Sequence, residues 1–282
     1  MSIGGQPLGA AGKVPFLDTP VDSFRFVYSN LGRFFALAWL PLVIDIAFSM
    51  TSGFLTETGS GETRSLADWV TYIVFLAASL AMYAVFAVRW HRFFLLDERE
   101  SVFGEILAAR NWRFLGYTLL LAFAPVVLEF LIAFGAVLSG AGSLVAETID
   151  MVISYIGRYK FAWVIVFVIF SRFFLVLPAT AVDRPLTLGK AWHIMRGNSW
   201  RFIGATYLGA ILVVVVSRMV LTQHLEPRAG AEPQTAIDAI VIYALVDFLA
   251  IAVGITVLSK FYRHIVGMEA PEGGESGAAA GP

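Results

Sequence analysis

The sequence predicts an all-α, polytopic membrane protein with six transmembrane helices, and composition and apolar run length are the first two reasons. The 282 residues are 58% hydrophobic and 15% charged, whereas a soluble domain carries about 25% charged residues. The apolar residues gather in runs of about 20, the length of a helix that crosses roughly 30 Å of hydrocarbon. We expect a membrane domain over residues 18–267, between a disordered N-terminus (1–17) and a disordered C-terminal tail (268–282).

The third reason is a short phrase that occurs three times and divides the domain into three repeated units. Its copies are Asn30-Leu31-Gly32-Arg33-Phe34, Asn111-Trp112-Arg113-Phe114 and Asn198-Ser199-Trp200-Arg201-Phe202. Apolar residues at helical spacing precede each copy, and a long apolar run follows it. Each unit is therefore predicted to be an interfacial helix plus a helix pair. The interfacial helix turns into the membrane at an elbow that carries Arg33, Arg113 or Arg201.

In the first unit, Thr19-Pro20-Val21-Asp22 is typical of a helix start. Thr19 would be the N-cap, Pro20 would take the first helical position and Asp22 would complete a capping box. The residues that would form the apolar face of this interfacial helix are Val21, Phe24, Tyr28 and Leu31. The first two transmembrane helices are expected at about 34–51 and 68–88.

In the second unit, the spacing of Phe103, Ile106, Leu107 and Arg110 indicates another interfacial helix, followed by a transmembrane helix at about 114–137. The register of the fourth transmembrane helix has two solutions. Hydropathy alone favours 161–182, whereas aligning Arg172 with Arg92 and Lys260 as the inner ends of the even-numbered helices gives 148–171. Both registers give the same topology.

In the third unit, apolar residues at helical spacing predict the last interfacial helix, and they are Leu188, Ala191, Trp192 and Met195. Transmembrane helices five and six are expected at about 202–221 and 236–258.

Basic residues set the orientation. Fifteen Lys and Arg residues fall on the side of the termini and elbows, and two, Arg64 and Arg228, fall on the other side. Positively charged loops stay in the cytoplasm, so both termini are predicted to be cytoplasmic in a multi-pass bacterial inner-membrane protein. The first 20 residues lack an apolar core, so the first membrane helix is expected to act as an uncleaved anchor.

The third unit resembles a family of bacterial membrane proteins. The residues that carry the resemblance are Arg172, Leu177-Pro178-Ala179, Ala191-Trp192 and Arg196-Gly197-Asn198-Ser199-Trp200-Arg201. They are similar to the signature of uncharacterised six-helix inner-membrane proteins, which include the YciC-like proteins and the membrane domain fused to some glycerophosphodiester phosphodiesterases. The resemblance implies a six-helix inner-membrane fold. It implies no catalytic residues, and the soluble phosphodiesterase barrel is absent from this sequence.

Ionisable residues inside the predicted helices form one layer. At ~1.5 Å per residue, Asp45, Glu129 and Asp247 and the basic residues Arg158 and Lys160 all lie about 18–24 Å from the cytoplasmic helix ends. A charge facing lipid is costly, so we expect Arg158 or Lys160 to pair with one of the three acids. The layer is interpreted either as helix pairing or as a polar path for an ion or proton.

No motif points to catalysis. The chain has no cysteine, which excludes disulfides and thiolate metal sites, and its four histidines lie apart, so we expect no metal and no cofactor. The formal net charge of −1 gives no reason to expect nucleic acid, and membrane lipids are the expected partners. We expect a non-enzymatic envelope scaffold or accessory factor, or alternatively a transporter or lipid-handling protein that uses the charged layer.

Overall fold

The computed structural model of the chain describes residues 13–57, 65–99, 106–138, 167–184, 186–209, 213, 215 and 233–268. Regular structure in these segments is entirely helical, which confirms the predicted all-α class. In chain order the elements are α1 (Asp18–Ser29), α2 (Leu31–Glu57), α3 (Leu66–Leu96), α4 (Ala109–Leu138), the 3-10 helix η2 (Ser171–Phe173), α7 (Val176–Ala181), α8 (Leu188–Ile194) and α10 (Pro233–Val266). Residues 199–209, between α8 and α10, are helical as well.

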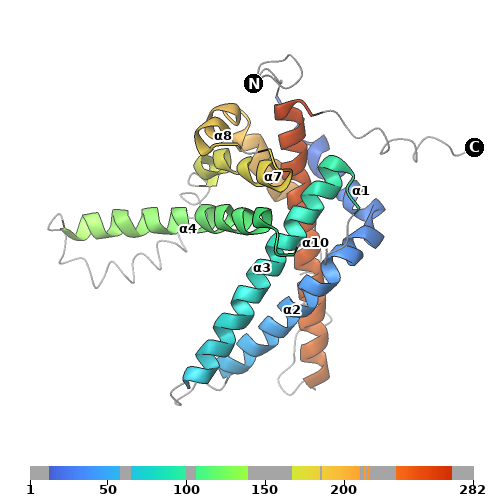
Figure 1. The fold of residues 1–282 in the computed structure, drawn as a ribbon. Coiled ribbons are helices and arrows are strands. Elements are labelled where there is room, and N and C mark those ends of the chain that lie inside the picture. The colour runs from blue at the N-terminus through green and yellow to red at the C-terminus, as the bar shows by residue number, and fades with distance from the viewer. Residues whose placement is uncertain are drawn as a thin grey trace, which may run out of the picture.

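Three of these helices are long and apolar enough to cross a membrane. The segments are Leu31–Thr51, Leu66–Leu96 and Asp238–Val266, and they match the predicted first, second and sixth transmembrane helices. α2 and α3 form an antiparallel pair, and α10 runs lengthwise beside them (Figure 1). α3 starts at a capping box, in which the Ser65 side chain accepts from the Asp68 N–H and the Asp68 carboxylate accepts from Ser65.

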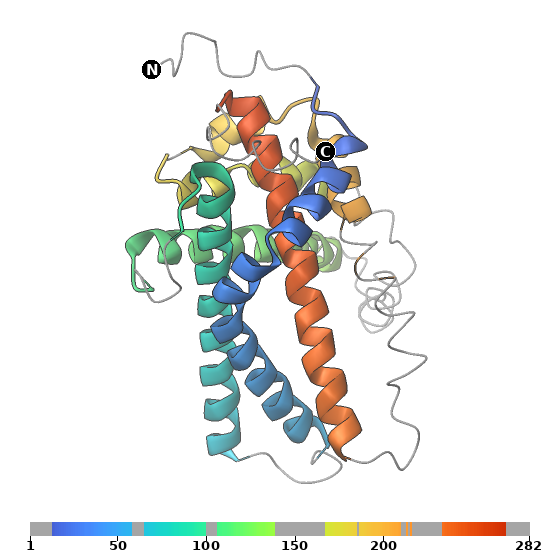
Figure 2. The same ribbon diagram turned by 90° about the vertical axis from the view of Figure 1, so that its right-hand side faces the viewer.

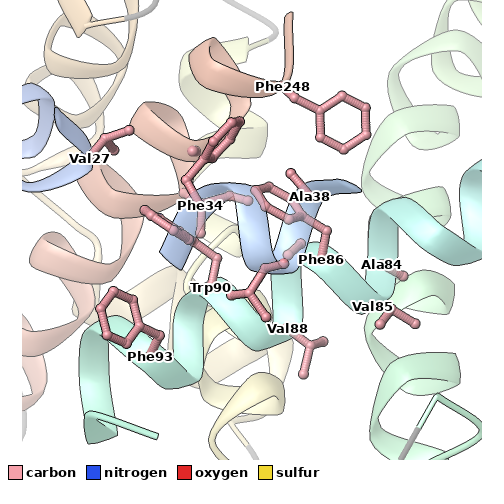
Figure 3. Packing of buried hydrophobic residues seen from close by; sticks show 14 of the residues in the cluster. Val27, Phe34, Ala38, Ala84, Val85, Phe86, Val88, Trp90, Phe93 and Phe248 are labelled. Carbon is pink, nitrogen blue, oxygen red and sulfur yellow. The ribbon is translucent and has the colours of Figure 1, made fainter. Parts of the chain in front are cut away.

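The main apolar core lies where α2, α3 and α10 meet near α1. Phe34 of α2 packs edge-on against Trp90 of α3, with ring centroids 6.1 Å apart, and Phe86 packs edge-on against Phe248 of α10 at 5.4 Å (Figure 3). At the far end of α3, Trp69 and Ile73 are about half exposed. The core therefore holds the three helices together at the α1 end, while the far end of α3 presents apolar side chains outward.

α1 does not begin as predicted. Its N-cap is Leu17, which makes no side-chain cap hydrogen bond, so the assignment of Thr19 as the N-cap was wrong. Thr19 lies inside the helix, and its hydroxyl donates backward to the Pro15 carbonyl at 2.6 Å. Asp22 accepts a hydrogen bond from Lys260 Nζ at 3.0 Å instead of closing a capping box, and this bond ties α1 to α10.

The apolar face predicted for α1 points away from the protein core. Val21, Phe24 and Tyr28 are 55%, 50% and 69% exposed, whereas Val27 is 3% exposed and belongs to the core. If lipid covers the apolar face of an interfacial helix, that face must point away from the protein core, as it does in α1.

Residues 13–17, which we call the N-terminal strap, pack onto the helix at 199–209, although we expected this segment to be disordered. Val14 is 2% exposed. Its N–H donates to Asn198 Oδ1 at 3.2 Å, and its carbonyl accepts from Arg201 at 2.7 Å. The Phe16 ring lies 5.6 Å from the Trp200 ring. The third elbow thus holds the start of the described chain.

Two of the three predicted elbows are breaks between helices. Asn30 separates α1 from α2, and Asn198 ends the turn before the helix at 199–209. In both, the asparagine carbonyl accepts the N–H of the phenylalanine four residues later, Phe34 or Phe202, at 2.9 Å.

The second copy of the phrase is not a break, so that prediction was wrong. α4 already begins at Ala109, which places Asn111 in its first turn. The Asn111 side chain donates back to the Ile106 carbonyl at 2.9 Å, because the chain turns at residues 106–107, before the phrase. Residues 100–105, which hold part of the predicted second interfacial helix, lie outside the described residues.

α4 covers the predicted third transmembrane helix, but it lies across α3 and α10 rather than alongside them (Figures 1 and 2). Its first half is packed, with Phe114 2% and Leu121 5% exposed, whereas Phe123, Val127 and Leu131 are more than half exposed. The buried residues of its first half therefore fix the orientation of the helix.

The described helices constrain how the rest of the chain runs. α2 leads away from α1, α3 returns toward it, and α10 runs from the far end back to α1, where Lys260 meets Asp22 (Figure 2). The chain that leaves α3 at Asp97 must therefore reach the far end before Pro233.

The remaining predictions concern the segment after α4. α8 confirms a helix at the place predicted for the third interfacial helix, with the Thr187 side chain accepting from the Lys190 N–H at its start and with Ala191 and Met195 fully buried. The start of the fourth transmembrane helix lies outside the described residues in both registers. Residues 167–181 form a short apolar helical segment, and only residues 202–209, 213 and 215 of the predicted fifth helix are described.

Candidate functional site

A cavity of about 480 Å³ lies between α3, α4 and α10. Residues 167–177 and the helix at 199–209 complete its wall, so all three sequence units contribute to it. This volume falls within the range of about 300–1,000 Å³ that is typical of small-molecule sites. The cavity is large enough for a ligand and is partly open to the outside of the described helices.

The wall of the cavity is apolar and carries no charge. Its residues include Phe114, Leu121 and Pro125 of α4 and Ile255 and Leu258 of α10, and no Lys, Arg, Asp or Glu is among its described lining residues. A charged group would lose its hydration there without gaining a partner. The site therefore suits an uncharged, mostly hydrocarbon ligand.

Two consecutive side chains of α3 bond to hydroxyl groups of α10 beside this cavity. Trp90 Nε1 donates to Thr256 Oγ1 at 2.9 Å, and His91 Nδ1 lies 2.7 Å from Ser259 Oγ. All four residues are fully buried. These two bonds hold α3 against α10 and fix the orientation of the His91 ring, which lines the cavity.

The hydrogen bonds also assign the protons of His91. The Ser259 hydroxyl donates to the Ile255 carbonyl at 2.8 Å. Because a hydroxyl has only one proton to donate, Ser259 must accept from His91 Nδ1–H. In the neutral ring that the uncharged wall favours, Nε2 then carries a free lone pair.

Two polar atoms of the cavity wall have no protein partner. Within the described ranges, His91 Nε2 and the Thr206 hydroxyl are buried and make no hydrogen bond, and both residues line the cavity. A buried polar group left unpaired costs about 1–3 kcal/mol. A ligand that carries a hydrogen-bonding group would recover part of this cost.

A cluster of arginines gathers around Asp183, which follows α7. Asp183 forms ion pairs with Arg92 at 3.0 Å, with Arg110 at 2.6 Å and with Arg113 at 3.7 Å. Arg92 also forms a two-pronged ion pair with Glu98. Arg92 and Arg110 are mostly buried, whereas Arg113 is 60% exposed. This cluster joins the end of α3 to the start of α4.

The three elbow arginines all reach beyond their own elbow. Arg33 donates to the Glu98 carbonyl at 3.4 Å and lies over the Phe93 ring. Arg113 pairs with Asp183, and Arg201 holds the N-terminal strap. Their repeated positions therefore correspond to three different tertiary contacts.

The predicted charged layer is only partly described. Asp45 is half-buried and accepts from the Ser79 hydroxyl of α3 at 2.9 Å, and Asp247 lies exposed on α10. Glu129 lies on α4, but its side chain is outside the described residues, as are Arg158 and Lys160. Neither Asp45 nor Asp247 lines the cavity. The pairing of acids and bases in this layer stays a prediction.

Sequence reasoning did not find the cavity, because His91 looked like an ordinary histidine near a membrane surface. A usable signal was present in α10, where Thr256 and Ser259 place two hydroxyls three residues apart on one face of an otherwise apolar helix. Polar side chains inside such a helix generally face a partner or a cavity.

The described residues offer no evident metal site, since they contain no group of three or more His, Asp or Glu side chains that could hold an ion. Comparison of the chain with models of protein families, with curated proteins and with solved structures gives no match. The function must therefore be inferred from the geometry of the site.

Proposed function

We propose that the chain is a multi-pass inner-membrane protein that holds one apolar chain of a membrane lipid in the cavity between α3, α4 and α10. In this proposal the protein is a lipid-handling accessory factor rather than an enzyme. The observation that carries the proposal is the uncharged cavity of about 480 Å³. Its position beside membrane-length helices would let a lipid chain enter it from the bilayer.

The surface of the described helices supports a position in the membrane. An apolar stripe runs along the outside of α1 and α2, and its exposed members are Leu17, Val21, Phe24, Tyr28, Phe35, Trp39 and Val43. Large exposed apolar patches on a protein mark contact with a partner or with a membrane. Because this stripe follows both α1 and the start of α2, lipid is the partner that would cover it over its whole length.

For the topology, we propose six membrane crossings with both termini in the cytoplasm. The imbalance of fifteen basic residues to two supports this orientation. α3 ends beside α1, whereas α10 begins at the far end of the bundle, and these two positions are compatible with an even number of crossings in total.

Filling the cavity tests the proposed function. A Cβ added at Gly254 would meet nothing within 4 Å, and this glycine lines the cavity. Gly254→Leu should therefore project a side chain into the space where the lipid chain lies. The protein would be purified in mild detergent, and the phospholipid and neutral lipid that it retains would be quantified by mass spectrometry. We expect the variant to lose most of the retained lipid.

Gly116→Leu is the matched control, because Gly116 also has nothing within 4 Å of its added Cβ but does not line the cavity. Both changes replace a helical glycine with a better helix former. Equal amounts of lipid in the wild type and in both variants would contradict the proposal.

A scaffold is the second candidate, and the arginine cluster around Asp183 favours it. Arg113 is 60% exposed beside this aspartate, so an anionic partner could reach it. A scaffold would keep its cellular role when the cavity is filled by Gly254→Leu, whereas a lipid-handling protein would lose it.

A further inference from the structure

We propose that the ligand of this cavity is a neutral lipid with a hydroxyl group, and that this hydroxyl donates a hydrogen bond to His91 Nε2. The inference rests on the proposed function and names its class of ligand. The carrying observation is a fully buried histidine that lines an uncharged cavity and leaves one ring nitrogen without a protein partner.

The chemistry of the ring selects a hydrogen-bond donor. Ser259 Oγ accepts the hydrogen bond of Nδ1–H and donates its own hydroxyl hydrogen to the Ile255 carbonyl, so Nε2 of the neutral ring can only accept. A group that only accepts hydrogen bonds, such as an ester or an ether oxygen, cannot satisfy it.

The described lining residues carry no charge, and this narrows the class of ligand further. A phosphate or a carboxylate would need a cation, and an amine would enter as an ammonium ion that needs an anion. The lining residues supply neither. A hydroxyl is the uncharged donor that can end or interrupt an apolar chain, as in a long-chain alcohol or a diacylglycerol.

Thr206 offers the ligand a second hydrogen-bonding group. Its hydroxyl also lines the cavity and has no partner among the described residues. It can donate to a second oxygen of the ligand. The hydroxyls of Tyr83 and Thr118 also belong to lining residues, and that of Thr118 donates to the Phe114 carbonyl. The described wall therefore offers an acceptor at His91 and hydroxyls at Tyr83 and Thr206 within a mainly apolar surround.

The test compares three probes of equal chain length: radiolabelled hexadecanol, its methyl ether and hexadecanoate. Each would be bound to the delipidated full-length protein in detergent micelles and measured by equilibrium dialysis. The ether keeps the oxygen but lacks the donor. We expect the wild type to bind the alcohol roughly tenfold more tightly than the ether, the effect of about one hydrogen bond. Hexadecanoate should bind no better than the ether.

His91→Phe should bring the affinity for the alcohol down to that for the ether and leave the affinity for the ether within about twofold. Ser259→Ala provides a second route if His91→Phe does not fold, because freeing Nδ1 lets the ring proton move to Nε2 and should weaken the preference for the alcohol. His193→Phe is the control, since His193 is exposed on α8 and does not line the cavity. It should keep the full preference.

The outcomes separate this inference from the proposed function. If the wild type binds alcohol and ether equally while Gly254→Leu abolishes both, the cavity binds lipid but the role of the hydroxyl is overturned. A preference for the alcohol that survives both His91→Phe and Ser259→Ala also overturns it. If no probe binds to the wild type, both proposals fail.

Discussion

Three ion pairs of the described chain converge on Asp183. It pairs with Arg92, Arg110 and Arg113, so its removal would leave three guanidinium groups without this carboxylate. Its backbone is left-handed, with φ 55°, a conformation that asparagine tolerates well. Asp183→Asn therefore removes the charge and leaves the local backbone unstrained.

We predict that Asp183→Asn lowers the free energy of unfolding by roughly 1–2 kcal/mol, because the two mostly buried arginines lose their ion pair. Thermal unfolding in detergent would measure the change. Asp97→Asn is a close control: Asp97 has φ 52°, and its side chain is 45% exposed against 47% for Asp183. Asp97 pairs with the exposed Arg99, so its loss should cost less than about 0.5 kcal/mol. Equal effects of the two changes would contradict the role assigned to Asp183.

At the scale of residues, the sequence singled out some side chains that make tertiary contacts but did not identify their partners. The repeated phrase singled out Arg33, Arg113 and Arg201, yet their partners are distant in sequence and differ from one another. The sequence shows the position of His91 in the chain, but the hydrogen bond between His91 and Ser259 depends on how α3 packs against α10. The apolar periodicity of one segment does not show which other helix that segment packs against.

The N-terminal strap packs closely against a glycine of the helix at 199–209. A Cβ at Gly204 would lie 2.3 Å from Cε2 of Phe16, which is too close for the ring to stay in place. Phe16 also contacts Trp200. Gly204 therefore provides the space in which the strap packs on the helix at 199–209.

We predict that Gly204→Val displaces Phe16 and releases the strap. Trypsin should then cleave after Lys13 several times faster than in the wild type, because protection by local structure is lost when the backbone opens. Gly189→Val is the control, since Gly189 also lies in a helix and has open space around its added Cβ. Unchanged cleavage in Gly204→Val would show that Phe16 does not anchor the strap.

At the scale of elements, the length of the apolar runs predicted the long helices well, since α2, α3 and α10 overlap the ranges that it gave. The short helix α8 lies where apolar periodicity placed it. The crosswise course of α4 was not predictable in this way. It depends on Phe114, Leu121 and the ion pairs of Arg110 and Arg113 with Asp183, all of which form only in the folded protein.

The number of membrane crossings belongs to the whole molecule. α3 ends beside α1 and α10 begins at the far end of the bundle, and the proposed six-crossing topology has three crossings between Asp97 and Pro233. Since the chain has no cysteine, single cysteines can be labelled without first removing others. Four positions separate the possibilities: Ser60, Ser143, Ala229 and Ser276.

We predict that a membrane-impermeant maleimide added to spheroplasts labels Ser60→Cys, Ser143→Cys and Ala229→Cys, but labels Ser276→Cys only after the membrane is opened. The reason is that the basic residues gather on the side of Ser276. Labelling at Ser60 and Ala229 without labelling at Ser143 would reduce the passages to one and the total to four. Labelling of Ser276→Cys in intact spheroplasts would overturn the orientation.

The most direct measurement of the central claim is a high-resolution structure of the protein in nanodiscs of native lipid. The proposal predicts elongated density of one lipid chain between Phe114, Leu121 and Ile255, ending in a polar group beside His91 Nε2. A cavity filled by the protein's own side chains, or occupied by ordered water alone, would contradict the claim that this protein holds a lipid.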